Sequence, residues 1–242
     1  MTAYILDTET TGLVEPHLTE VAYCIVDVAD DGNVILKQEP RSKRYNPLKP
    51  ISLGAMATTH ICQEDIENEP PHTDFKLPAS VEYVIGHNID FDMQVLANAG
   101  VTHKPKLICT KAIATHLLPE LDSHKLTALL YYFHTETARA QARNAHAAEA
   151  DIYFTRLVLQ SLIDVAIDYG NPITGIEDLY SFSEIARVPK VLSFGKYKGQ
   201  KISDLANTMD GRSYLGWLAT RDDVDPYLLK SIKQAFEGEN NF

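Results

Sequence analysis

A turn at residues 30–33, with the sequence Asp-Asp-Gly-Asn, constrains the fold of this chain more than any other feature. It joins the apolar run 21–28 to a second run at 34–38, and such a turn between apolar runs predicts an antiparallel hairpin. The first eight residues form another short apolar run, which ends on acidic side chains. We therefore expect three antiparallel strands at the start of the chain.

Shorter apolar runs later in the chain are each followed by a helical pattern. Residues 83–86 and 107–109 are predicted to be strands, and residues 91–98 and 111–118 are predicted to be the helices that follow them. A longer helix is expected from residue 145 to about 169. This order predicts an α/β fold, whose mixed sheet has three antiparallel strands followed by parallel strand–helix units.

Three regions are expected along the chain. The sheet and its helices occupy residues 1–168, and residues 169–189 are a connector with some helical content. Residues 190–242 are expected to form a small C-terminal domain, made of a strand-like segment at 191–194, a turn that contains glycine, and two helical patterns. The segment 40–50, which contains prolines and basic residues, is interpreted as a loop.

Composition and patterning exclude some classes of protein. With 242 residues, 45% of them hydrophobic, the chain can bury a sizeable core. We expect no membrane partner, because the sequence lacks an apolar stretch of about 18 residues, and the N-terminus does not resemble a signal peptide. Three widely separated cysteines, Cys24, Cys62 and Cys109, fit neither a disulfide framework nor a zinc site. They indicate free thiols and a cytoplasmic location.

The net charge of −11 opposes a nucleic-acid partner at first sight, because phosphate contacts usually come from a basic surface. That objection weakens if several carboxylates bind divalent cations, since bound metal ions reverse the local electric field. The charge therefore argues only against tight, non-specific binding to long duplexes.

Asp7 and Glu9 stand at the end of the first expected strand. Side chains alternate along a strand, so these two carboxylates share one face and repel each other. Cations between them would relieve the repulsion, and a metal site is therefore one interpretation. The alternative is a polar strand end before the turn at residues 10–12, and this motif alone favours the alternative.

Two further motifs combine acidic residues with a histidine. The segment 87–92 lies between an expected strand and an expected helix, where helix capping would explain one polar residue but not the whole group. His146 and Asp151 lie at the start of the long helix, and they converge best if His146 occupies the loop or the first turn. Taken singly, each of these residues has an ordinary structural explanation.

In order and spacing, the three motifs resemble the DEDDh exonucleases of the DnaQ-like superfamily, with the pattern D-x-E, then H-N-x-x-F-D, then H-x-A-x-x-D. The resemblance covers roughly residues 1–168. Residue type alone leaves the second motif's ligand open between Asp90 and Asp92, and the family register selects Asp92. Glu149 stands where the family often has an apolar residue, and it is expected to face solvent. The matching residues are Asp7, Glu9, His87, Asn88, Phe91, Asp92, His146, Ala148 and Asp151.

The resemblance implies an RNase H-like fold and a 3′–5′ exonuclease that uses two divalent cations, Mg²⁺ or Mn²⁺, to hydrolyse phosphodiester bonds. It assigns Asp7, Glu9, Asp92 and Asp151 to the cations, with Asp7 as the bridging ligand. His146 is implied as the base that takes a proton from the attacking water. Activity is therefore expected to rise from weakly acidic to alkaline pH.

The same resemblance implies contacts to the terminal nucleotide. They are expected from an apolar residue after the first acids and from the stretch 56–61, for which a helix packed under the site is the alternative. The candidate substrate contacts are Thr10, Leu13, His60, Ile61, Asn88 and Phe91.

The C-terminal region offers a second candidate surface. Residues 187–201 contain five basic side chains and no acidic one, and basic residues interleaved with aromatic ones are typical of single-strand binding. The segment 194–199 also resembles the C-terminal extension of one member of the superfamily. The alternative is a small helical domain with a basic turn and a core that includes Tyr214, Trp217 and Leu218. The candidate contacts are Phe194, Lys196, Tyr197 and Lys198.

The expected partner is single-stranded DNA or a DNA 3′ end, in DNA repair or proofreading. An RNA 3′ end is the alternative substrate, as for exonucleases of the RNase T or oligoribonuclease type, because the same carboxylates serve either sugar. Another alternative is a non-catalytic module that binds nucleic acid or associates with a polymerase, and a structural metalloprotein is a third. A homodimer also stays open.

Overall fold

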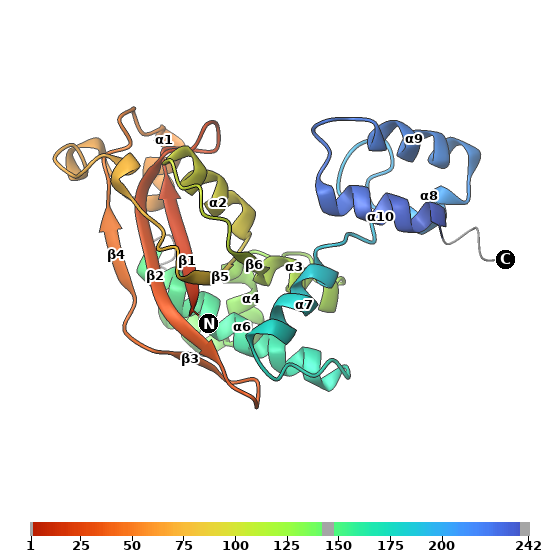
Figure 1. Cartoon of the computed structure of the whole chain (residues 1–242), viewed down its shortest axis with the longest axis horizontal. Helices are drawn as coiled ribbons and strands as arrows, with labels where there is room; N and C mark the ends of the chain where they lie inside the picture. Colours follow the sequence, from red (N-terminus) through yellow and green to blue (C-terminus); the bar gives the residue numbers. More distant parts are fainter. Residues whose placement is uncertain (1, 142–147, 238–242) are drawn as a thin grey trace. The chain divides into compact units, whose positions relative to one another are not determined.

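The computed structural model of the chain describes residues 2–141 and 148–237. The chain divides into two compact units, Met1–Ser183 and Glu184–Phe242, and the sheet belongs to the first (Figure 1). None of the helices within the described residues combines the length and the apolar character that crossing a membrane requires.

The first part of the sheet contains β1 (Thr2–Thr10), β2 (Leu18–Val28) and β3 (Val34–Leu36). Neighbouring strands in this part are antiparallel. Gly32, with a φ of 82°, lies in the turn between β2 and β3, and this left-handed conformation is one that glycine adopts without strain. The prediction of three antiparallel strands is confirmed.

The interpretation of residues 40–50 as a loop is wrong for four of them. Arg41–Arg44 form β4, which pairs antiparallel with β2. All four side chains of β4 are exposed. No alternation of apolar and polar residues therefore marks this strand in the sequence.

The parallel part of the sheet follows in strand–helix units. β5 (Val81–Gly86) pairs with β1, and β6 (Lys106–Cys109) pairs with β5, both in parallel. Helices α2 (Ile89–Asn98) and α3 (Thr110–Leu117) follow these two strands. The described strands run in the order β3-β2-β1-β5-β6, with β4 beside β2. This is the mixed α/β sheet that was expected, and the prediction of fold class is confirmed.

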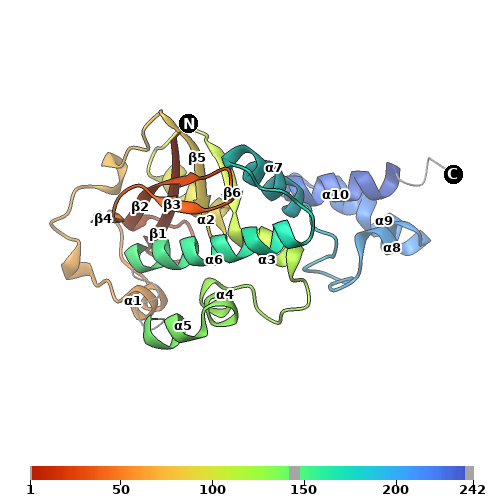
Figure 2. The ribbon, with the colours of Figure 1, turned by 90° about the horizontal axis from the view of Figure 1, so that it is seen from below.

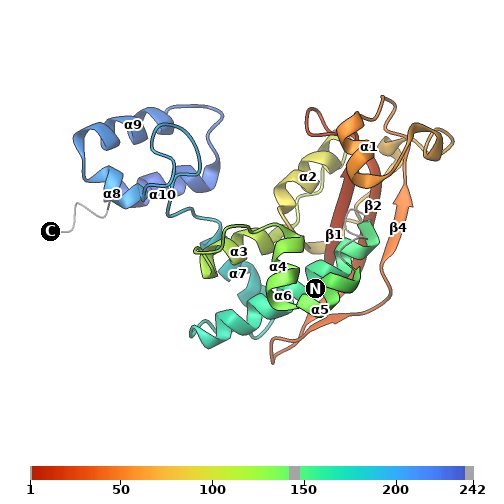
Figure 3. The ribbon, with the colours of Figure 1, turned by 180° about the vertical axis from the view of Figure 1, so that it is seen from behind.

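Helices α2 and α6 (Ala148–Asp168) cover opposite faces of the sheet at β1. Leu6 shares an apolar cluster with Val95 and Leu96 of α2, whereas Asp7, its neighbour on β1, faces α6. Because side chains alternate along a strand, the two helices lie on different faces. Figure 2 shows α6 running across the strands, and Figure 3 shows both helices beside β1.

Among the shorter helices of the first unit, α1 (Leu53–Thr59) overlaps the stretch 56–61, for which a helix was the alternative expectation. Helices α4 (Leu126–Phe133) and α5 (Thr135–Gln141) have no counterpart among the predicted elements, and α4 packs against both α5 and α6. Seven of the eight residues of α4 are hydrophobic, and a short apolar run does not distinguish a helix from a strand.

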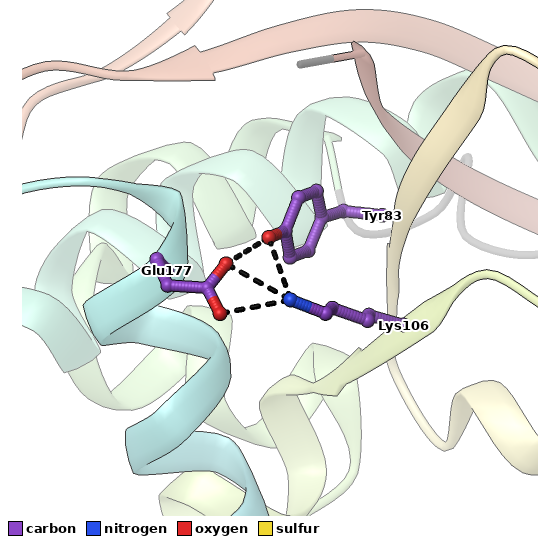
Figure 4. Close-up of polar contacts among 3 residues, drawn as sticks. All are labelled: Tyr83, Lys106 and Glu177. Carbon is purple, nitrogen blue, oxygen red and sulfur yellow. Dashed lines mark hydrogen bonds and ion pairs between the residues drawn. The ribbon is translucent and has the colours of Figure 1, made fainter.

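A polar cluster ties α7 (Ile176–Ala186) to the parallel strands (Figure 4). The Tyr83 hydroxyl on β5 donates a hydrogen bond to Glu177 of α7, and Lys106 Nζ on β6 donates to Glu177 Oε1 at 2.8 Å. The Lys106 ammonium also lies 5.1 Å from the ring centroid of Tyr83 and 5.0 Å from that of Tyr180. The helical content expected in the connector is therefore α7, whose first turn is fixed on the sheet.

The second unit has α8 (Ile202–Ala206), α9 (Met209–Ala219) and α10 (Pro226–Glu237) among its described residues. These helices surround a core of buried apolar side chains. The described residues contain three helices where two helical patterns were expected, and the strand expected at 191–194 is wrong. The segment contributes a single bridge, between Val191 and Lys201, because the chain turns back at Gly195 and Gly199.

Candidate active site

Three carboxylates from two elements meet at the end of β1. Asp7 and Glu9 extend from one face of β1, and Asp151 extends from the first turn of α6. One carboxylate oxygen of each residue lies within 4.8 Å of the others. Glu9 and Asp151 are 8% and 7% exposed. The crossing of α6 over β1 therefore brings together two motifs that are more than a hundred residues apart in sequence.

Asp92 reaches the same place from α2. Its Oδ1 accepts hydrogen bonds from the Thr8 amide at 3.0 Å and from the Thr8 hydroxyl at 2.7 Å. Asp92 is 4% exposed, whereas Asp90 lies on the exposed side of the helix. Of the two acids that residue type left open, Asp92 is the one placed beside the cluster.

Burial and mutual repulsion disfavour negative charge at this cluster. Burial raises the pKa of Asp7 well above its usual range, and the charges of Asp92, Asp151 and Glu9 raise that pKa further. Burial, followed by the charge of Asp151, raises the pKa of Glu9 to about 8. Burial also raises the pKa of Asp92 to about 7, although the hydrogen bonds from Thr8 lower it.

Such a group of oxygen atoms attracts positive charge, either as protons or as cations. Hard divalent cations prefer carboxylate oxygens and neutralise several of them at once. Asp7, Glu9 and Asp151 therefore have the donor atoms and the electrostatics of a divalent metal site.

The carboxylates line a cavity of about 860 Å³. Four of the six predicted substrate contacts, Thr10, Leu13, Asn88 and Phe91, also line it. Leu13 is 85% exposed, so its side chain is available to a ligand.

The other two predicted substrate contacts are not among the residues that line the cavity. Ile61 is 2% exposed and packs with Ile51 and Ile66. His60 is exposed in a left-handed conformation at the end of α1. Thr58 and Thr59, in the same stretch, do line the cavity.

Asn88 does not serve the helix-capping role that was its alternative explanation. It occupies the N-cap position of α2, but its side chain makes no capping hydrogen bond. Its φ of 75° is left-handed, a conformation that asparagine tolerates better than most residues. The backbone thus turns sharply where the Asn88 side chain enters the cavity lining.

His87 fastens the loop before α4 to the end of β5. Its Nε2 lies 2.8 Å from the carbonyl oxygen of His124, and its Nδ1 lies 2.9 Å from Thr110 Oγ1. Burial lowers the pKa of His87 to about 4, so the ring is neutral at physiological pH. A neutral ring has one donor nitrogen, and the carbonyl can only accept, so Nε2 donates to His124 and Nδ1 accepts from Thr110.

Two lysines that were not predicted from the sequence also line the cavity. Lys111 lies in the first turn of α3, and Lys125 follows His124 at the start of α4. An isolated lysine carries no sequence signal of its own. The position of Lys125 depends on the hydrogen bond between His87 and the loop, which only the folded chain reveals.

Two predictions concern the segment before α6. His146 lies outside the described residues. Glu149 is exposed, as expected, and its Oε1 accepts a hydrogen bond from the Ser42 amide of β4 at 3.0 Å. Glu149 therefore helps to hold the start of α6 against the sheet.

Comparisons of the amino-acid sequence identify a family and similar proteins. The family model described as Exonuclease, of the RNase T type, matches residues 4–159, which is more than half of the chain. Exodeoxyribonuclease 10 of Escherichia coli strain K12 is 30% identical over 236 residues, covering 96% of this chain and 98% of that protein. DNA polymerase III PolC-type of Oceanobacillus iheyensis is 25% identical over 177 residues, covering 69% of this chain and 12% of that protein.

Comparisons with solved structures point the same way. Exonuclease X in complex with 5′-overhanging duplex DNA has a TM-score of 0.54 and 26% identity, covering 75% of this chain and 99% of that chain. E. coli exonuclease I in complex with a dT13 oligonucleotide has a TM-score of 0.53 and 20% identity, covering 70% of this chain and 42% of that chain, which is a likeness of fold. The chain therefore belongs to the exonuclease family, within the DnaQ-like superfamily with its RNase H-like fold.

Proposed function

We propose that this chain is a 3′–5′ exodeoxyribonuclease, which removes nucleotides from DNA 3′ ends by metal-assisted hydrolysis. The observation that carries the proposal is the meeting of Asp7, Glu9 and Asp151 in a cavity of a chain that belongs to the exonuclease family. DNA is favoured because the E. coli relative is named an exodeoxyribonuclease, and because the exonuclease X structure holds a duplex with a 5′ overhang. Such a duplex presents a recessed 3′ end, which is the end proposed for attack.

The four carboxylates fit two divalent cations, Mg²⁺ or Mn²⁺. Asp7 would be a ligand together with Glu9 and Asp151, whose carboxylate oxygens lie within 4.8 Å of its own. Asp92, whose charge raises the pKa of Asp7, would supply a further carboxylate. When bound, the cations supply an activated water and neutralise charge on the phosphate.

Proton transfer and substrate binding are assigned to further residues. His146, two residues before the start of α6, is proposed to accept the proton of the attacking water. Leu13, Phe91 and Asn88 are proposed to hold the terminal nucleotide, with Thr10 beside them. Lys111 and Lys125 line the cavity and together are called the cationic wall. We assign this wall to binding the phosphates that precede the terminal one.

The compartment proposed for this reaction is the reducing cytoplasm. The three cysteines are free, and two of them, Cys24 and Cys109, are buried. Free thiols persist where glutathione and thioredoxin keep them reduced.

The first prediction concerns the reaction itself. With Mg²⁺, 5′-labelled single-stranded DNA is expected to give a ladder of products that shorten from the 3′ end, and EDTA is expected to stop the reaction. Asp92→Asn should abolish the ladder, and His146→Ala should slow it by about 10²- to 10⁴-fold. Asp90→Asn is the matched control, because it removes an exposed acid two residues away.

Each other outcome of this assay rejects a specific part of the proposal. Full activity of Asp7→Asn, or activity in EDTA, contradicts the metal-assisted mechanism. Shortening of a matched RNA but not of DNA makes the chain an RNA exonuclease. Binding without cleavage of either strand makes it a non-catalytic module.

The second prediction concerns pH and stability. The pKa of Glu9 is raised from 4.5 to about 8 in the folded chain. Between these pH values the folded state therefore binds more protons than the unfolded state. The free energy of unfolding of the metal-free protein should consequently fall as pH rises through this range. Divalent cations compete with those protons, so Mn²⁺ should raise Tm more at pH 8 than at pH 5.

Thermal unfolding of the wild type and of Glu9→Gln tests this prediction. The substitution removes one titrating carboxylate, so the metal-free variant should lose less stability between pH 5 and pH 8 than the wild type. A Tm that does not respond to Mn²⁺ at pH 8 would contradict the assignment of the cluster to cations.

The third prediction concerns the cationic wall. Lys125→Ala is expected to raise KM for a DNA oligonucleotide by roughly 10-fold with little change in kcat, because a phosphate contact is lost. The slope of a plot of log KM against log salt concentration should also decrease by about 1. Lys104→Ala, an exposed lysine of the same unit outside the cavity lining, is the control. If the two variants have equal KM and kcat values, Lys125 does not contact the substrate.

A further inference from the structure

We propose that the second unit binds single-stranded DNA through an aromatic row, which consists of Tyr197, Tyr214 and Trp217. The inference rests on the proposed function for the nature of the ligand. It adds a binding site on the unit that does not contain the carboxylates.

Tyr214 is the middle ring of the aromatic row and contacts the other two. The ring centroids of Tyr197 and Tyr214 are 5.1 Å apart, and those of Tyr214 and Trp217 are 5.6 Å apart. Tyr214 and Trp217 are three residues apart on α9, so they lie on the same side of that helix. Tyr197 reaches them from the loop between Leu192 and Gln200.

This loop has a fixed shape and is seated on the aromatic row. The Leu192 amide donates to the carbonyl oxygen of Gln200 at 3.0 Å, and the Gly199 amide donates to the carbonyl oxygen of Leu192 at 2.8 Å. Gly195 has a φ of 73°, and a Cβ there would overlap the Tyr214 hydroxyl. The loop backbone therefore lies directly against Tyr214, and the loop and α9 share one surface.

Cations stand at both ends of the aromatic row. Lys196 Nζ lies 4.8 Å from the ring centroid of Tyr197, and Arg221 Cζ lies 5.3 Å from that of Trp217. Arg221 also donates to both carboxylate oxygens of Asp223, at 2.8 and 2.6 Å, which fixes the guanidinium but offsets its charge. The exposed lysines of the loop, Lys196 and Lys198, are therefore assigned the phosphate contacts.

Trp217 has no place in the core of the second unit. The buried cluster contains Leu215 and Leu218, which flank it in sequence, whereas Trp217 is 51% exposed. The alternative that placed Trp217 in the core is therefore wrong, but it is right for Leu218, and Tyr214 is half-buried against that core. A large aromatic ring kept half in solvent beside cations offers a face on which a base can stack.

Two of the four contacts predicted for this region, Tyr197 and Phe194, differ in their exposure to solvent. Tyr197 is half-buried and packs against the core, so it forms the base of the surface more than its outer face. Phe194 is 46% exposed on the same loop and remains available to a ligand.

Charge distinguishes the second unit from the first. Residues 184–242 contain nine basic and eight acidic side chains, whereas residues 1–183 contain 13 basic and 25 acidic ones. The segment 187–201 has five basic residues and no acidic one. A polyanion is therefore attracted to the loop and repelled by much of the remaining surface. Exposed rings favour a single strand, because a duplex hides the faces of its bases.

The binding site has a consequence for substrate length. A strand held by the second unit keeps its 3′ end near the catalytic unit, because the two units belong to one chain. Long single strands should benefit from this tethering, whereas oligonucleotides of four or five residues should not.

Trp217 provides a direct test, because it is the single tryptophan of the chain. The full chain is titrated with an unlabelled 20-residue oligothymidylate in EDTA, which prevents hydrolysis. Stacking of a base on Trp217 is expected to quench its fluorescence in a saturable manner, with the same Kd as binding measured by anisotropy of a labelled oligonucleotide. Binding by anisotropy with unchanged tryptophan fluorescence, or no binding at all, would overturn the proposal.

Matched variants separate stacking from charge. Trp217→Ala is expected to weaken binding about 10-fold, and Trp217→Phe to restore much of it, because a ring is retained. The pair Lys196→Ala and Lys198→Ala should reduce the salt slope of log Kd by about 1.4. The pair Lys230→Ala and Lys233→Ala on α10 removes the same charge from exposed sites of the same unit, and Kd should stay near the wild-type value. Kd values equal to that of the wild type for Trp217→Ala and for the Lys196→Ala and Lys198→Ala pair would reject the aromatic row.

The outcome for this unit is distinguishable from that for the catalytic unit. Trp217→Ala should leave cleavage of a four-residue oligonucleotide unchanged while slowing cleavage of a long strand at low enzyme concentration. If the wild type cleaves no nucleic acid, the proposed function fails, but quenching of Trp217 still tests the second unit alone. Equal loss of activity on short and long strands would show a structural role instead.

Discussion

The carboxylates at the end of β1 repel one another, and the fold of the first unit has to hold them together. When ionised, Asp7, Glu9 and Asp151 repel one another. They would move apart if the strand and the helix that carry them were free to move. Packing of α6 across β1 and β2 holds them together. Asp92 is held from the opposite face by two hydrogen bonds from Thr8. Packing of the helices on the sheet thus offsets the repulsion among these carboxylates.

Much of this arrangement could be predicted from the sequence because it depends on local patterns. Apolar runs and the turn at residues 30–33 indicate the antiparallel strands, and the D-x-E spacing places Asp7 and Glu9 on one face. The choice between Asp90 and Asp92 needed either the family register or the fold, because both acids lie in the first turn of α2. The fold distinguishes the two acids, because Asp92 is buried and Asp90 is exposed.

The parts that were missed depend on contacts between distant segments. β4 has only exposed side chains, so its pairing with β2 leaves no pattern in the sequence. Ile61 is apolar, as a substrate contact would be, but a small cluster with Ile51 and Ile66 buries it. Lys125 reaches the cavity because a half-buried, neutral His87 holds the carbonyl of the preceding residue.

The carboxylates on β1 and α6 are proposed to bind the cations that drive hydrolysis, and anomalous diffraction from crystals of the protein grown with Mn²⁺ tests this directly. Anomalous peaks are expected in contact with carboxylate oxygens of Asp7, Glu9 and Asp151, and the peaks should be lost in crystals of Asp7→Asn. Peaks only elsewhere on the protein, with these three carboxylates free of Mn²⁺, would contradict this proposal.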